Sequence, residues 1–159
     1  MIKKILLSIP LFLFLSNCGF TPLYSTNKMN DINVEILTHE GDRDINLKLI
    51  SKLKTNSSTE GKLYKVKIST NYEKITLTNN LAGEPEEYQL ESSVLFTIIE
   101  NNSEKKISVN EKFVMKNLSD DFEERNYERS IKKNMANLIY NKFLLQIKKF
   151  KWFIKVLKL

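Results

Sequence analysis

Alternation of apolar and polar residues predicts four strands in the middle of the chain. Ile32, Val34 and Ile36 mark a first short strand, residues 32–37. In a second strand, Tyr64 to Tyr72, apolar residues alternate with polar ones, so one face is apolar and the other wet. Two more strands are predicted where apolar residues occupy every second position. The third strand has Tyr88, Leu90, Val94, Phe96 and Ile98 at even positions, and the fourth has Ile107, Val109, Phe113 and Met115 at odd positions. With turns at 79–85 and 100–105, these strands predict an antiparallel meander.

Apolar residues at helical spacing predict two helices. The first is expected to begin at an Asp42 cap and end near Thr55, with Ile45, Leu49, Ile50 and Leu53 on one face. The second opens at Ser119 or Asp120, because Asp120 and Glu123 have capping-box spacing. Its predicted buried stripe is Tyr127, Ile131, Met135, Leu138, Ile139 and Leu145, with Lys142 reaching past it to water. The pattern therefore predicts an α+β two-layer sandwich, with both helices on one face of a mainly antiparallel sheet of about four strands.

The first twenty residues have a different composition from the rest. Lys3 and Lys4 precede an apolar run at 5–15, which has the length of a signal-peptide core and is too short to span a bilayer. The run ends in Leu-Ser-Asn-Cys, which is similar to a lipoprotein lipobox except that Asn17 replaces the usual Gly or Ala. Cys18 is the only cysteine, so it is the candidate lipidation site and no intramolecular disulfide can form. The alternative is a buried cysteine in an ordinary secretory leader.

These features divide the chain into four parts. Residues 1–17 are predicted to be a removable lipoprotein signal peptide, 18–30 a lipidated tether, 31–149 the α+β domain and 150–159 a basic amphipathic C-terminal extension. The formal net charge of +6 becomes +4 when Lys3 and Lys4 leave with the leader. This basic excess favours anionic partners such as phosphorylated lipid or a membrane surface, whereas nucleic acid is not expected as a partner of an exported protein.

The sequence lacks the residue patterns that catalysis or metal binding require. His39 is the only histidine and has no cysteine or second histidine with which to share a metal, so we expect a surface side chain. No glycine-rich phosphate loop or nucleophile elbow is present. Glu84, Glu86 and Glu87 lie beside a Gly-Pro turn, where carboxylates are typical of a solvated loop. We therefore expect a non-enzyme without a cofactor or metal.

Three segments in the same order resemble the LPS-assembly lipoprotein LptE family in its alphaproteobacterial form. Residues 18–24, Cys-Gly-Phe-Thr-Pro-Leu-Tyr, are similar to the family's mature N-terminus. Residues 41–44, Gly-Asp-Arg-Asp, lead into a short helix of Leu and Ile. Residues 124–129, Glu-Arg-Asn-Tyr-Glu-Arg, lead into the final helix. The resemblance covers essentially the whole mature chain.

The resemblance implies an outer-membrane lipoprotein, lipid-anchored on the periplasmic side. Such a protein assembles with and plugs the LptD β-barrel and takes part in lipopolysaccharide transport and insertion at the outer membrane. Gly19 is consistent with an outer-membrane location, because Asp after the lipidated cysteine is the usual inner-membrane retention signal. A second function stays open: an unrelated outer-membrane lipoprotein with a structural or generic binding role, which reached a small sandwich by convergence.

Basic side chains are the candidate contacts to the phosphates of lipopolysaccharide. On the second strand these are Lys65 and Lys67, on its wet face, and Lys74 near its end, with a solvated strand face as the alternative. At the end of the chain, helical spacing gathers Lys148, Lys151, Lys155 and Lys158 on one side, with Trp152 at the margin. This tail is predicted to form a membrane or partner interface. Alternatively, it prolongs the final helix and packs its apolar side on the sheet.

Overall fold

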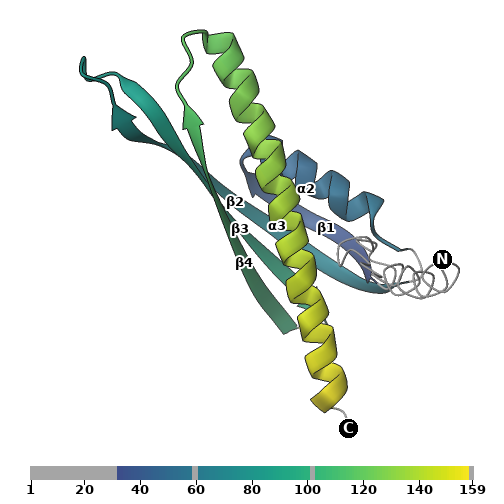
Figure 1. The fold of residues 1–159 in the computed structure, drawn as a ribbon. Coiled ribbons are helices and arrows are strands. Elements are labelled where there is room, and N and C mark those ends of the chain that lie inside the picture. Colours follow the sequence, from purple (N-terminus) through teal and green to yellow (C-terminus); the bar gives the residue numbers. More distant parts are fainter. Residues whose placement is uncertain (1–31, 59–60, 101–102, 158–159) are drawn as a thin grey trace, which may run out of the picture.

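The computed structural model describes residues 32–58, 61–100 and 103–157, and side chains up to Lys149. The elements are β1 (Ile32–Gly41), α2 (Arg43–Thr55), β2 (Lys62–Asn79), β3 (Pro85–Glu100), β4 (Ser103–Lys116) and α3 (Asp121–Leu157). The strands lie in chain order across one sheet, as Figure 1 shows. β1 and β2 are parallel, whereas β2, β3 and β4 form the predicted antiparallel meander.

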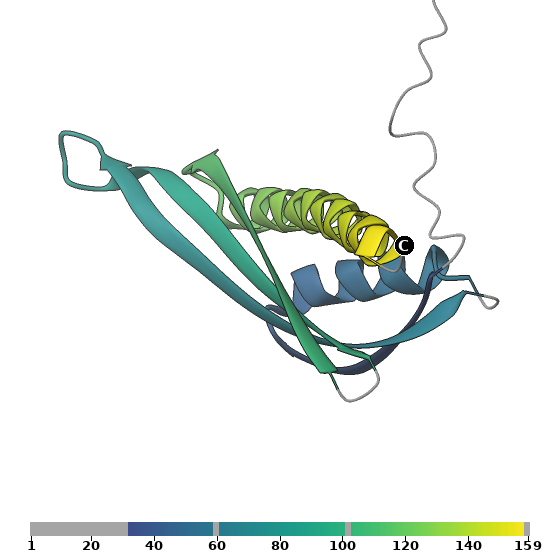
Figure 2. The ribbon, with the colours of Figure 1, turned by 90° about the horizontal axis from the view of Figure 1, so that it is seen from below.

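Both helices lie on one face of the curved sheet and leave its other face open (Figure 2). The predicted α+β two-layer sandwich is therefore confirmed. α2 makes the parallel pair possible, because it carries the chain back along β1 to the point where β2 begins. At this return the Ser57 hydroxyl accepts a hydrogen bond from the Val34 N–H at 2.9 Å, and Ile32 pairs in register with Lys62.

The core lies between the helices and one parity of each strand. The sheet contributes Val34, Tyr64, Val66, Ile68, Leu90, Val94, Phe96, Ile98, Ile107, Val109 and Met115, and α2 contributes Ile45, Leu49 and Leu53. Near its centre, the rings of Phe96 and Phe143 stack with their centroids 4.0 Å apart. The predicted parities of β2, β3 and β4 are thus confirmed.

The corner between β1 and α2 is fixed onto β2 by polar contacts. The Asp42 carboxylate accepts a bond from the Ile45 N–H at 3.0 Å, which confirms the predicted cap. Gly41 has a φ of 92°, and a Cβ there would lie 1.7 Å from the Thr70 carbonyl oxygen, so only glycine fits. The buried Asn46 side chain donates to the Glu40 carbonyl at 2.9 Å and accepts from the Thr70 hydroxyl at 2.7 Å.

The predicted buried stripe of α3 is wrong at three positions: Tyr127, Leu138 and Leu145 are exposed. The helix instead buries Ile131, Met135, Ala136, Ile139, Tyr140, Phe143, Leu144 and Ile147. Many of these residues are four apart, and each such step advances by about 40° around a helix of 3.6 residues per turn. The buried side therefore rotates gradually around α3 as the helix crosses the sheet and α2. A prediction that keeps the buried residues at one fixed angle on the helix does not follow this rotation. Lys142 is exposed, as predicted, with its Nζ 2.6 Å from Glu111 Oε1.

The strands are longer than the apolar pattern predicts. β1 continues to Gly41, and β3 and β4 leave a shorter turn than residues 100–105, since only 101 and 102 separate them. The β2–β3 hairpin turns within the predicted segment 79–85 and reaches past the helices (Figure 2). The molecule thus has a hairpin end, and an opposite end where β1 begins.

Candidate functional site

A cluster of charged and aromatic side chains joins the start of α3 to β2 on the covered face. We call it the inner charged cluster; its members are Asp42, Tyr72, Lys74, Tyr88, Glu124, Glu128 and Lys132. Lys74 Nζ lies 2.7 Å from Glu124 Oε1 and 3.2 Å from Glu128 Oε2. Lys132 Nζ lies 2.8 Å from Asp42 Oδ2 and 3.4 Å from Glu128 Oε1. These side chains are between 14% and 26% exposed, so water screens their charges only partly.

Two tyrosines complete the inner charged cluster. The Tyr72 hydroxyl donates to Glu128 Oε1 at 2.9 Å, and Lys132 Nζ lies 3.9 Å from the centre of the Tyr72 ring. Lys74 Nζ lies 4.1 Å from the centre of the Tyr88 ring. Both lysines therefore combine an ion pair with a cation–π contact.

The cluster shifts the acidity of its members. Burial raises the pKa of Tyr72, and the bond to Glu128 raises it further. Burial acts to raise the pKa of Glu128, but the bonds from Tyr72 and Lys74 and the charge of Lys132 leave it below its ordinary value. The bond from Lys74 holds the pKa of Glu124 low in the same way. Both carboxyl groups are thus stabilised in their charged form.

The cluster holds the first turns of α3 in place. Ile131 is the first buried apolar residue of this helix, whereas Phe122 and Tyr127 are exposed. Glu124 and Glu128 provide the side-chain bonds that connect this segment to β2. The contacts of Lys74 are therefore structural, and they lie on the covered face.

Lys65 and Lys67 lie on the open face, two residues apart on β2. Both are exposed; Lys67 Nζ is 3.8 Å from Glu104 Oε1, and Lys65 stands in register beside Glu35 of β1. The structure thus brings two of the three predicted lysines together and separates them from Lys74. The sequence already carried this signal, because residue 74 has the parity of the apolar residues Tyr64 to Tyr72.

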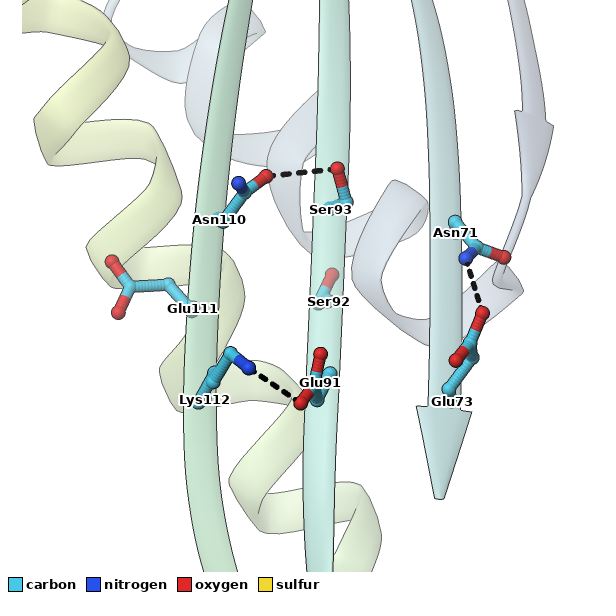
Figure 3. A pocket seen from close by; sticks show the side chains of 8 residues that line it. All are labelled: Asn71, Glu73, Glu91, Ser92, Ser93, Asn110, Glu111 and Lys112. Atoms are coloured by element: carbon cyan, nitrogen blue, oxygen red, sulfur yellow. Dashed lines mark hydrogen bonds and ion pairs between the residues drawn. The ribbon is translucent and has the colours of Figure 1, made fainter. Parts of the chain in front are cut away.

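Further along the sheet, toward the hairpin, lies a polar groove of about 260 Å³. Figure 3 shows the side chains that line it. Three bonds connect its side chains to one another: Asn71 Nδ2 to Glu73 Oε1 at 2.8 Å, Ser93 Oγ to Asn110 Oδ1 at 2.8 Å, and Lys112 Nζ to Glu91 Oε1 at 2.6 Å. Ser92 and Glu111 also border the groove. The six side chains joined by these bonds largely satisfy each other, so this part of the groove has the character of a solvated strand surface.

The hairpin presents an apolar side chain that the pattern of apolar and polar residues does not predict. Leu81 is fully exposed at the tip of the β2–β3 hairpin. The tip is ordered around Asn80, whose Oδ1 accepts from the N–H groups of Ala82 and Glu84, both at 2.9 Å. Exposed Ile75 and Leu77 lie nearby on β2. In the sequence, this exposed side chain could have been recognised as a single leucine inside a loop of Asn, Ala, Gly and Glu.

The predicted residues at the two ends of the chain are only partly described. Cys18 lies outside the described residues, as does Lys158. α3 is one continuous helix to Leu157, so residues 150–157 prolong its backbone; the side chains of Lys151, Trp152 and Lys155 lie outside the description. Lys148 is exposed.

The remaining chemical candidates lie at the surface. His39 is exposed in β1, as predicted, and Glu84 and Glu86 are exposed at the hairpin. Within the described residues, no three acidic, histidine or cysteine side chains are grouped so as to hold a metal ion. Over the same part of the chain, no helix has both the length and the apolar character needed to cross a membrane.

Comparison with solved structures identifies the fold. Rare lipoprotein B from Shewanella oneidensis has a TM-score of 0.62 at 11% identity, over 79% of this chain and 99% of that one. A protein described as a lipoprotein from Caulobacter crescentus has a TM-score of 0.55 at 16% identity, over 74% and 88% of the two chains. Lipoprotein B from Nitrosomonas europaea has a TM-score of 0.55 at 16% identity, over 79% and 89%. At these identities the likeness concerns the fold. No family model and no curated protein matches the sequence.

Proposed function

We propose that this protein is a lipid-anchored outer-membrane lipoprotein on the periplasmic side. In this proposal it assembles with and plugs an LptD-like β-barrel and takes part in lipopolysaccharide transport and insertion. One observation carries the proposal: a chain with a lipobox-like sequence at residues 15–18 has the fold of three bacterial lipoproteins. The resemblance of residues 18–24 to the start of mature LptE proteins supports the narrower assignment.

The lipid anchor is tested at Cys18, whose thiol is the only one in the chain. In a Cys18→Ala variant we expect an uncleaved precursor without lipid, because no other side chain there can form the thioether to diacylglycerol. Cells are labelled with a fatty acid, and the label on the purified protein is measured. Cys18→Ser is a sterically close control and is expected to lose the label as well. Equal label in the variants and the unaltered protein would contradict the anchor.

The barrel partner is tested by co-purification from mild detergent extracts. The hairpin end offers exposed Ile75, Leu77 and Leu81, and grouped exposed apolar side chains often mark a surface that contacts another protein. We expect the tagged protein to co-purify with a large β-barrel, and Leu81→Asp to reduce the yield. Leu145→Asp, on an exposed part of α3, is the matched control. Recovery of general envelope proteins alone would overturn the assignment to the barrel.

Contact with lipopolysaccharide is tested at Lys65 and Lys67, because Lys74 is engaged in the inner charged cluster. Replacing Lys65 and Lys67 with Gln should weaken binding about tenfold or more, as each charge-assisted contact to phosphate contributes about 1.5–3 kcal/mol. Lys112→Gln with Lys116→Gln removes the same charge from β4 and serves as the control. Unchanged affinity in the first variant would make Lys65 and Lys67 ordinary solvated residues.

A further inference from the structure

Basic side chains gather at the end of the molecule where β1 begins. We define the basic end as Lys52, Lys54, Lys62, Lys105, Lys106, Lys148 and Lys149. Lys62 opens β2 beside Ile32, while Lys105 and Lys106 follow the β3–β4 turn. α2 ends here too, since Ser57 bonds to β1, and Figures 1 and 2 place the end of α3 here. Four strand and helix termini therefore bring together lysines that are far apart in the sequence.

Among the described residues of the basic end, the exposed lysines outnumber the acids beside them. Glu100 pairs with Lys62, and Glu104 lies 3.8 Å from Lys67 on the open face. Lys54, Lys106, Lys148 and Lys149 are exposed. The basic end therefore carries a net positive charge that faces water.

The hairpin end has the opposite charge. Its acids are Glu84, Glu86 and Glu87 on the hairpin and Asp120, Asp121 and Glu123 at the start of α3. The two segments are adjacent, because the Asn117 N–H donates to the Glu86 carbonyl at 2.8 Å. Lys116 is a nearby cation on β4. The long molecule is thus positive at one end and negative at the other.

We propose that the basic end docks on the anionic phospholipid headgroups of the membrane that holds the anchor. This inference rests on the proposed function for the anchor, because the segment that precedes Ile32 joins the body at this end. Residues 19–31 can span up to about 45 Å, so an anchor at Cys18 does not by itself fix which surface faces the lipid. The difference in charge between the two ends determines which surface faces the lipid. A negative membrane surface attracts the basic end and repels the acidic hairpin end within about a Debye length.

Chemical labelling of lysines in the full protein tests the orientation. Protein purified from bacterial membranes is reconstituted in vesicles of phosphatidylcholine alone, or with roughly one-third phosphatidylglycerol. An amine acetylating reagent is added, and modification of each lysine is followed by mass spectrometry. We expect Lys54, Lys62, Lys106 and Lys148 to react about threefold or more slowly in the anionic vesicles, and Lys112 and Lys116 to react equally in both. About 0.5 M salt should remove the difference.

Two matched variants distinguish an effect of the basic end from an effect of the protein's total charge. Replacing Lys54, Lys106, Lys148 and Lys149 with Gln should abolish the slow labelling of Lys62 in anionic vesicles. Replacing Lys112, Lys116, Arg125 and Lys133 with Gln removes the same charge from exposed positions elsewhere and should preserve it. Slow labelling that survives the first set, or equal labelling in the two kinds of vesicle, overturns the docking surface.

A fatty-acid label on Cys18 distinguishes the two proposals. If the protein is lipidated but its end lysines react equally in both vesicles, the docking surface is wrong and the anchor stands. If the protein carries no lipid, the anchor fails. Protein added to the same vesicles from solution then still tests whether the basic end binds them.

Discussion

The two faces of the sheet carry ion pairs of similar length in different surroundings. On the covered face, Lys132 and Asp42 are 2.8 Å apart and each side chain is 14% exposed. On the open face, Lys112 and Glu91 are 2.6 Å apart, but the lysine is 62% exposed. An ion pair that is exposed to water contributes little to the stability of the fold. In a partly buried site, loss of one partner leaves the other charge without compensation. Exposure, more than distance, therefore decides which pair holds the fold.

The covered face itself has two parts. Toward the basic end, α3 is held by the apolar core, in which Phe143, Ile139 and Met135 are fully buried and Phe143 stacks on Phe96 of β3. Toward the hairpin, the inner charged cluster holds the same helix on β2. Contacts between apolar side chains do not depend on pH, whereas the cluster depends on the charge of two carboxylates. The two halves of α3 are therefore expected to respond to different perturbations.

The largest effect is expected where α3 crosses the apolar core. Phe143→Ala removes the ring that stacks on Phe96 and leaves a cavity, so the free energy of unfolding should fall by about 3–5 kcal/mol. Leu145→Ala, at a half-exposed position on the same helix, should cost less than about 1 kcal/mol. Urea unfolding followed by circular dichroism measures both variants. Equal losses would show that the described packing of α3 is wrong.

A smaller effect is expected in the inner charged cluster. Glu128→Gln keeps the shape of the side chain but removes the charge that faces Lys74, Lys132 and the Tyr72 hydroxyl. We expect a loss of about 1–3 kcal/mol in the free energy of unfolding, since Lys74 keeps Glu124 and Lys132 keeps Asp42. Tyr72→Phe removes one bond to Glu128 and should cost less. A neutral effect of Glu128→Gln would show that the cluster does not hold α3.

The pH dependence sharpens this comparison. In the folded protein, Glu124 and Glu128 have pKa values below the ordinary 4.5, so the unfolded chain takes up protons first as the pH falls. Their contribution to stability is complete above about pH 4.5 and is lost as the pH falls through the folded values. Urea unfolding between about pH 7 and pH 3 should therefore show the unaltered protein converging on Glu128→Gln at the acid end. A constant difference between them would contradict the lowered pKa of Glu128.

The strands and α2 were predictable because local patterns specify them. Alternation in β2 gives the buried residues Tyr64, Val66 and Ile68, and the Asp42 cap marks the start of α2. The parallel pairing of β1 with β2 depends on the path of α2, and no strand pattern encodes it. The buried side of α3 depends on two neighbours at once, the sheet and α2. Its drift around the helix is therefore a tertiary feature.

The candidate sites were predictable only as residue types. Lys65 and Lys67 lie on the predicted wet face, but Lys74 belongs to a cluster whose partners Glu124 and Glu128 are about fifty residues away. Contacts over that separation leave no local pattern in the sequence. The basic end is equally nonlocal, because its lysines come from both helices and two strands. Charge counted along the chain showed only a modest basic excess, while the fold separates the two signs.

The smallest effect is expected on the open face. Lys112→Gln breaks the ion pair with Glu91, and by distance alone this change should resemble the loss of a contact in the inner charged cluster. The lysine is largely in water, however, so the free energy of unfolding should change by less than about 0.5 kcal/mol. Urea unfolding in low salt measures this small difference, and about 1 M salt should reduce it further, because added salt screens an exposed pair. A loss comparable to that of Glu128→Gln would mean that the groove on the open face is as important to the fold as the covered face. The contrast drawn from exposure would then fail.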